Sequence, residues 1–183
     1  ISKKNAHIIF ILLLSSSLII AAILNWKLVI VLIFLFVNTT VHSQWLKNFA
    51  YVDLLSISLN FVIRVLAVML LLQVGISPLL FVGVFLVAFF LGLMKRKSEI
   101  IILKDTDALH RKSLSKYSIK KLNYSLLIVS VLVIVTYSLY SITNDPTNDN
   151  RLIFTIPIVA IIIFRQYYLS EKSVSVKKFN EVI

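Results

Sequence analysis

The sequence has 183 residues, of which 59% are hydrophobic, with a mean hydropathy of +0.95 and a formal net charge of +11. A soluble globular domain has roughly 45–50% apolar residues, so this composition excludes that class and indicates an integral membrane protein. The absence of cysteine excludes disulfides and thiolate metal sites. The three histidines, His7, His42 and His110, are too scattered to indicate a ligand cluster.

Long apolar runs with only three Gly and three Pro favour transmembrane helices over barrel strands. A spanning helix needs about 17–25 residues, and six segments qualify. We therefore expect an all-α, polytopic transmembrane helical bundle that forms a single domain, 1–183. The predicted spans are 7–24, 28–45, 54–73, 79–94, 122–142 and 152–169.

Short polar or turn-forming segments join these spans into three helical hairpins. The first connection is Asn25-Trp26-Lys27, with an interfacial tryptophan. The second is Gly75-Ile76-Ser77-Pro78, and the third is the polar segment 143–150. Between the second and third hairpins lies a longer basic loop, 94–121.

The distribution of positive charge predicts the orientation in the membrane, because Lys and Arg near span ends collect in the cytoplasm. Nine of the nineteen Lys and Arg residues lie in the loop 94–121. If six spans alternate across the membrane, 16 of the nineteen lie on the same side as this loop. Lys27 and Arg151 fall on the other side, and Arg64 lies within a span. We therefore expect a multi-pass protein of the inner (cytoplasmic) membrane whose basic loop faces the cytoplasm. Anionic lipids suit such a surface, and we expect no nucleic-acid partner.

Arg64 is a cation inside the third predicted span, where insertion costs at least about 2.5–3.5 kcal/mol. The functional interpretation is that it faces a water-filled cavity and binds an anion. The alternative is that it pairs with a neighbouring helix or snorkels. Asn60 precedes it by one helical turn and shares its face. Asp53, at the start of the same helix, is either an N-cap or part of a site.

The sequence Lys95-Arg96-Lys97-Ser98-Glu99 follows the fourth predicted span. If the helix continues, spacings of three and four residues place Glu99 beside both Lys95 and Arg96. Cations in this arrangement can neutralise a leaving diphosphate, while the acid positions a hydroxyl, a metal or the cations themselves. The alternative is a basic membrane anchor with an incidental ion pair.

Residues 105–117 resemble a short capped helix in which Arg111 and Tyr117 follow two acidic residues. Such an element can act as a lid that brings Arg111 and Tyr117 over a cavity. It is equally compatible with a surface helix held by anionic lipids.

Three stretches together resemble the UbiA-type membrane transferases: 53–68, Lys95-Arg96-x-x-Glu99, and 111–117. More narrowly, they resemble the branch that makes polyprenyl-phosphoryl phosphoribose, the decaprenyl-phosphate phosphoribosyltransferases. The resemblance implies a bundle of about nine helices around a cavity open to the cytoplasm. It also implies Mg²⁺-dependent transfer of 5-phosphoribose from phosphoribosyl diphosphate to a polyprenyl phosphate, with release of diphosphate.

The resemblance also implies roles for individual residues. The catalytic motif falls on Lys95, Arg96 and Glu99. The substrate-binding residues of the family fall on Arg64 with its neighbour Asn60, on Arg111 and Tyr117, and less specifically on Lys47 and Asp53.

The sequence departs from the family pattern in two respects. A last helix is expected after the sixth span, where the sequence has residues 170–183 instead. The Asn-Asp-x-x-Asp-x-x-x-Asp motif that holds the metal should precede the helix near His7, and it is absent from these residues. We therefore expect the chain to correspond to spans three to eight, to lack the principal metal site, whose ligands stay unknown, and to be inactive alone. One alternative function is that of an aromatic prenyltransferase, which would use a second Asp-rich motif in place of Lys95-Arg96-x-x-Glu99. Another is a transporter or non-enzymatic membrane protein.

Overall fold

The computed structural model describes residues 2–103, 118–143 and 151–180. Within these ranges the chain is helical and contains no strand, and six helices are long and apolar enough to cross a membrane. This confirms the predicted all-α, polytopic bundle. The elements are α1 (Lys3–Leu24), α2 (Trp26–Gln44), η1 (Leu46–Asn48), α3 (Val52–Leu72), α4 (Pro78–Leu103), α5 (Ile119–Thr143), η3 (Arg151–Thr155) and α6 (Ile156–Asn180).

The sequence explains where several helices begin and end. Asn25 separates α1 from α2, and its side chain accepts a hydrogen bond from the backbone N–H of Lys27 at 3.0 Å, as an N-cap does. Gln73 ends α3 in the left-handed conformation (φ 54°). Pro78 is the first residue of α4, a position where its missing N–H costs no helical hydrogen bond.

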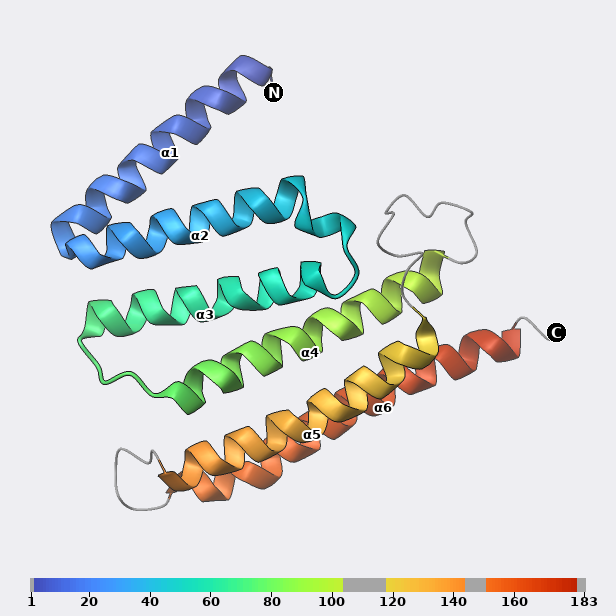
Figure 1. Ribbon diagram of the computed structural model, residues 1–183. Helices are drawn as coiled ribbons and strands as arrows, with labels where there is room; N and C mark the ends of the chain where they lie inside the picture. Colours follow the sequence, from blue (N-terminus) through green and yellow to red (C-terminus); the bar gives the residue numbers. More distant parts are fainter. Residues whose placement is uncertain (1, 104–117, 144–150, 181–183) are drawn as a thin grey trace.

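The hairpins place the connections alternately at the two ends of the molecule (Figure 1). The α1–α2 turn and the α3–α4 loop lie at one end. The connection between α2 and α3, which contains η1, lies at the other end with the C-terminal ends of α4 and α6. This arrangement agrees with the helical hairpins that the short connections predicted.

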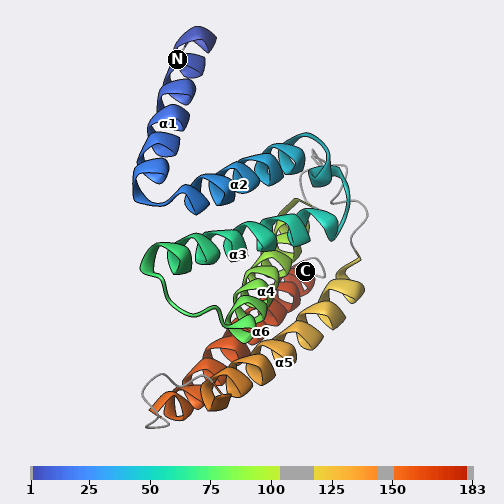
Figure 2. The ribbon, with the colours of Figure 1, turned by 60° about the vertical axis from the view of Figure 1, so that its left-hand side comes forward.

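Successive helices pack side by side, and α4 also contacts α6. The main buried cluster joins α3, α4, α5 and α6 through residues such as Leu54, Phe90, Leu93, Leu122 and Ile163. By contrast, α1 packs mainly against α2, in contacts that extend to the rings of Phe10 and Phe36, and its N-terminal end diverges from the other helices (Figures 1 and 2). The buried core therefore lies in the α3–α6 part of the bundle.

Two predicted boundaries need correction. We expected the fourth span to end at residue 94 and a loop to follow, but α4 continues to Leu103. The extension is stable because Ile100 and Ile101 are buried and the charged Arg96 is paired. The sixth span, predicted at 152–169, begins instead with the short turn η3 and continues as α6 beyond residue 169.

Candidate functional site

A buried ion-pair cluster links α3 to α4. Arg96 is only 3% exposed, and its Nη2 donates to Oδ2 of Asp53 at 2.7 Å. Its Nη1 donates to Oε2 of Glu99 at 2.5 Å. Asp53 is fully buried, whereas the side chain of Glu99 is 28% exposed. The guanidinium is therefore held between a buried carboxylate and one that reaches the surface.

Further positive charge lies beside this cluster. Lys95 is exposed, and Lys97 is 1% exposed. The Nε of Arg96 is buried and has no hydrogen-bond partner among the described residues. A buried donor of this kind is costly unless a ligand or water satisfies it. The Nε–H of Arg96 and the ammonium group of Lys95 are therefore available to bind a ligand.

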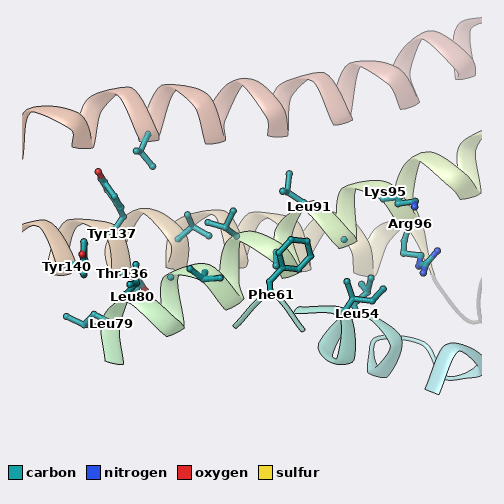
Figure 3. Close-up of a pocket in the computed structure, with 18 residues that line it drawn as sticks. Leu54, Phe61, Leu79, Leu80, Leu91, Lys95, Arg96, Thr136, Tyr137 and Tyr140 are labelled. Atoms are coloured by element: carbon teal, nitrogen blue, oxygen red, sulfur yellow. The ribbon is translucent and has the colours of Figure 1, made fainter. Parts of the chain in front are cut away.

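A cavity of about 510 Å³ begins at this cluster and runs between α3, α4, α5 and α6. Figure 3 shows Lys95 and Arg96 at one end, Tyr137 and Tyr140 towards the other, and Phe61 between them. The walls are almost entirely apolar. The cavity is therefore a largely apolar space with Lys95 and Arg96 at one end.

One face of α4 forms most of one wall. Its lining residues recur at helical spacings of three and four from Leu79 to Arg96, a distance of about 25 Å along the helix axis. Two of them are glycines, which leave room in the wall. The lining residues of α4 are Leu79, Leu80, Gly83, Val84, Val87, Ala88, Leu91, Gly92, Lys95 and Arg96.

A second polar cluster joins α2 to α3. Asn38 donates through Nδ2 to Oδ1 of Asn60 at 2.8 Å and to the carbonyl of Ser56 at 3.1 Å. Ser56 donates to Oδ1 of Asn38 at 3.2 Å, and Asn60 donates to Thr39 at 3.3 Å. These side chains satisfy one another between two membrane-spanning helices, so their clearest role is to fix how α2 and α3 pack.

Arg64 stands apart from the ion-pair cluster. It lies eleven residues after Asp53 in α3, which is about 16 Å along the helix axis. It is exposed, is not among the residues that line the cavity, and its guanidinium lies 5.6 Å from the ring centroid of Phe61. Such a cation–π contact is worth about 0.5–2 kcal/mol, less than the at least 2.5–3.5 kcal/mol that a cation costs at mid-membrane.

The described residues do not fit a magnesium site. In the ranges that the structure describes, no three His, Asp or Glu side chains come together. The two acids of the candidate site, Asp53 and Glu99, are both engaged by Arg96. The described residues therefore provide no ligand set for the Mg²⁺ that the resemblance implies, and we assign no step of a reaction to this ion.

The structure brings together some of the predicted site residues and separates others. One end of the cavity brings together Lys95, Arg96, Glu99 and Asp53. Asp53 is not the N-cap of α3, which is Tyr51. It lies within the first turn of that helix and is a buried ion-pair partner. Asn60 belongs to the α2–α3 polar cluster, away from that end. Lys47 lies in η1, at the same end of the molecule as the end of α4 (Figure 1). Arg111 and Tyr117 lie outside the described residues.

Sequence reasoning missed Asn38 and the cavity wall. The repeat of apolar and small residues along α4 was a readable signal for the wall, because spacings of three and four mark one helix face. In a transmembrane helix this pattern is easily overlooked, since the lipid-facing side is equally apolar. Tyr137 and Tyr140 of α5 carried no such signal.

Comparison with known proteins identifies the family. A search of the curated proteins finds no match. The profile of the UbiA prenyltransferase family matches residues 1–180, nearly the whole chain. This agrees with the helical membrane architecture and confirms the resemblance at the level of the family, while the phosphoribosyltransferase branch stays a prediction. The chain belongs to the UbiA prenyltransferase family, whose members are membrane transferases.

Proposed function

We propose that the protein transfers 5-phosphoribose from phosphoribosyl diphosphate to a polyprenyl phosphate and releases diphosphate, at the cytoplasmic face of the inner membrane. The observation that carries this proposal is the apolar cavity that ends at Lys95 and Arg96. An apolar chain beside α4 would place its phosphate at these cations. The basic surface around the same end supports the cytoplasmic orientation.

The nature of the charged motif favours this reaction over other transferase chemistry. Lys and Arg bind phosphate and diphosphate directly, Arg through paired N–H donors. An acidic motif would instead bind diphosphate through metal ions. Here the acids Asp53 and Glu99 are both paired with Nη atoms of Arg96. Lys95 and the Nε–H of Arg96 are therefore the groups of this cluster that remain to bind an anionic ligand.

The residues suggest a division of labour. A phosphate oxygen of the lipid attacks C1 of the ribose, and the bond from C1 to the diphosphate oxygen breaks with its electron pair leaving on the diphosphate. Lys95 and Arg96 stabilise this developing negative charge. Glu99 fixes the orientation of Arg96 and is exposed enough to accept a hydrogen bond from a ribose hydroxyl. Asp53 accepts a hydrogen bond from the other Nη atom of Arg96 and stays buried.

Of the other predicted substrate-binding residues, those that the structure describes lie outside the ion-pair cluster. Arg111 and Tyr117 stay predicted contacts from residues 104–117. Lys47 adds positive charge at the same end of the molecule. Arg64 does not join the diphosphate end, because about 16 Å along α3 separates it from the level of Asp53. Asn60 does not join it either, because it bonds to Asn38 and Thr39 of α2.

A second candidate is prenyl transfer to an aromatic acceptor. The name of the matching family, UbiA prenyltransferase, supports prenyl transfer but does not specify the acceptor. The same cavity would then hold the prenyl chain of a prenyl diphosphate, with the diphosphate at Lys95 and Arg96. The two reactions differ in which substrate carries the diphosphate. In the first the lipid is the acceptor, and in the second it is the donor.

The test is an assay of membranes that contain the protein as its gene encodes it. Labelled phosphoribosyl diphosphate with polyprenyl phosphate should give a labelled lipid, and Arg96→Ala should abolish its formation. Labelled prenyl diphosphate with an aromatic acid serves as the competing substrate pair. Product from the second pair alone would replace the proposal with prenyl transfer, and product from neither pair would favour a non-enzymatic role.

A further inference from the structure

Arg64 poses a problem that lies outside the proposed reaction. It is twelve residues after Val52 and eight before Leu72, so it lies roughly 18 Å and 12 Å from the two ends of α3. Its side chain is exposed on the outside of the helices that the structure describes. Exposed leucine or valine suits lipid, but an exposed guanidinium at this depth does not.

Snorkelling does not explain the position of this side chain. Side chains on a helix lean towards its N-terminus. The guanidinium accordingly lies over Phe61, almost one turn back along α3. The nearer end of the helix is the other one, at Leu72, so the charge points away from the closer membrane surface.

The spans that the structure describes offer no carboxylate at this depth. The six spans contain two acidic residues, Asp53 and Glu99. Both pair with Arg96, and Asp53 lies about 16 Å along α3 from Arg64. A second copy of these spans has the same two acids at the same depths, so it has no mid-membrane acid to offer either.

The surroundings of Arg64 form a helix-sized strip. On α3, the exposed residues Phe61, Val68 and Leu72 share a face with Arg64 at spacings of three and four residues. This strip, Phe61 to Leu72, continues the side of α3 that lines the cavity, because Phe61 belongs to both, and it lies next to the side that bonds to α2 through Asn60. A helix seated there would cover the cation and border the cavity.

We propose that the strip from Phe61 to Leu72 is the docking surface for a transmembrane helix that lies outside these 183 residues and carries an Asp or Glu near the middle of its span. The carboxylate would pair with Arg64, through two parallel hydrogen bonds at best. The apolar residues of the strip would supply the packing on either side of this pair. This role does not require the proposed transferase reaction, although the strip shares Phe61 with the cavity.

A model partner tests the proposal. The probe is a synthetic Leu-rich transmembrane peptide of about 20 residues with one central Asp, compared with matched peptides that have Asn or Leu there. The chain has no cysteine, so Gly75→Cys in the α3–α4 loop accepts a single fluorophore, and a Cβ at this position meets no atom within 4 Å. Energy transfer from the labelled protein to labelled peptide in phosphatidylcholine vesicles reports association.

The Asp peptide should bind about 3- to 15-fold more tightly than the Asn and Leu peptides, the range measured for polar contacts between membrane helices. Arg64→Leu should remove this preference, and Arg64→Lys should keep part of it. Arg165→Leu, which removes an exposed cation from α6, is the matched control and should leave the preference unchanged. Arg64→Leu makes the span more apolar, so loss of insertion does not confuse the result.

Three outcomes would overturn the proposal. One is equal binding of the Asp, Asn and Leu peptides by the unsubstituted protein. Another is an Asp preference that survives in Arg64→Leu. The third is competition by polyprenyl phosphate in the vesicles that disappears in Arg64→Leu, which would identify the occupant as a lipid phosphate and not a helix.

Discussion

The carboxylate of Asp53 lies 2.7 Å from Nη2 of Arg96, although the two residues are 43 positions apart in the chain. This contact joins the first turn of α3 to the last turns of α4. Because both side chains are almost completely buried, it fixes the depth at which the guanidinium meets the cavity. It also accounts for an arginine within the fourth membrane-spanning helix.

Neutralising Asp53 should destabilise the protein. Asp53→Asn leaves the shape of the side chain but removes the charge that compensates Arg96. Breaking a buried pair by removing one partner costs about 3–5 kcal/mol, and we expect the lower end because Glu99 still pairs with Arg96. The thermal unfolding midpoint in detergent micelles measures the effect.

A double substitution separates charge from packing. Asp53→Leu with Arg96→Met removes both charges and should recover much of the stability, as apolar replacements of buried pairs do. The double variant should nevertheless be inactive. An Asp53→Asn protein that unfolds at the same temperature as the unsubstituted protein would show that the contact does not carry the stability we assign to it.

Glu99→Gln should separate activity from stability. The Glu99 side chain is 28% exposed, so loss of its ion pair should cost at most about 1 kcal/mol of stability. Turnover of the proposed reaction should fall roughly tenfold to hundredfold, because the orientation of Arg96 and a ribose contact are lost together. Undiminished product formation, with the unfolding midpoint as control, would remove Glu99 from the mechanism.

The sequence was sufficient for the architecture and for part of the site. Apolar runs of spanning length gave the six helices, and the match of residues 1–180 to the UbiA prenyltransferase family confirms the family resemblance. The spacing of Arg96 and Glu99 on one helix predicted their contact, because residues three apart in a helix are neighbours. Local patterns were reliable here because local geometry determines them.

The relations between helices were not predictable in the same way. Asp53 near a helix start resembled an N-cap, and only the packing of α3 on α4 gives it Arg96 as a partner. Likewise, nothing in the sequence of α2 indicated that Asn38 would meet Asn60. The end of α4 was placed nine residues too early, because a run of charges resembles a loop when its burial is unknown.

The pair of Asn38 and Asn60 should show energetic coupling. Asn38→Leu leaves the amide of Asn60 without its 2.8 Å partner, and Asn60→Leu does the converse. Each single substitution should cost about 0.6–1.7 kcal/mol, the range for polar contacts between membrane helices. In a double-mutant cycle the double variant should cost less than the sum. Strict additivity would show that the two amides act independently.

The two cavity-lining glycines should respond differently to alanine. A Cβ at Gly92 would lie 2.9 Å from Cδ2 of Leu54, the end of a side chain that is itself buried and has little room to turn away, so Gly92→Ala should cost about 1 kcal/mol through overpacking. At Gly83 the nearest atom, Cγ2 of Thr136, is 3.9 Å away. Gly83→Ala should be neutral or stabilising by up to about 1 kcal/mol, because alanine favours a helix. Equal unfolding midpoints for the two variants would contradict the close approach at Gly92.

A bulky side chain at Gly83 should obstruct the cavity without disturbing its charged end. Gly83 lies about 20 Å along α4 from Arg96, and the space in front of it is part of the cavity. Gly83→Phe should therefore displace the far part of a lipid tail and raise KM for a long polyprenyl phosphate roughly tenfold, the equivalent of about two buried methylene groups. KM for phosphoribosyl diphosphate should not change, and a polyprenyl phosphate too short to reach Gly83 should be used as before. Gly75→Phe, outside the cavity, is the matched control. If Gly83→Phe raised KM for the short and long lipids equally, the tail would not run along α4 towards Tyr140.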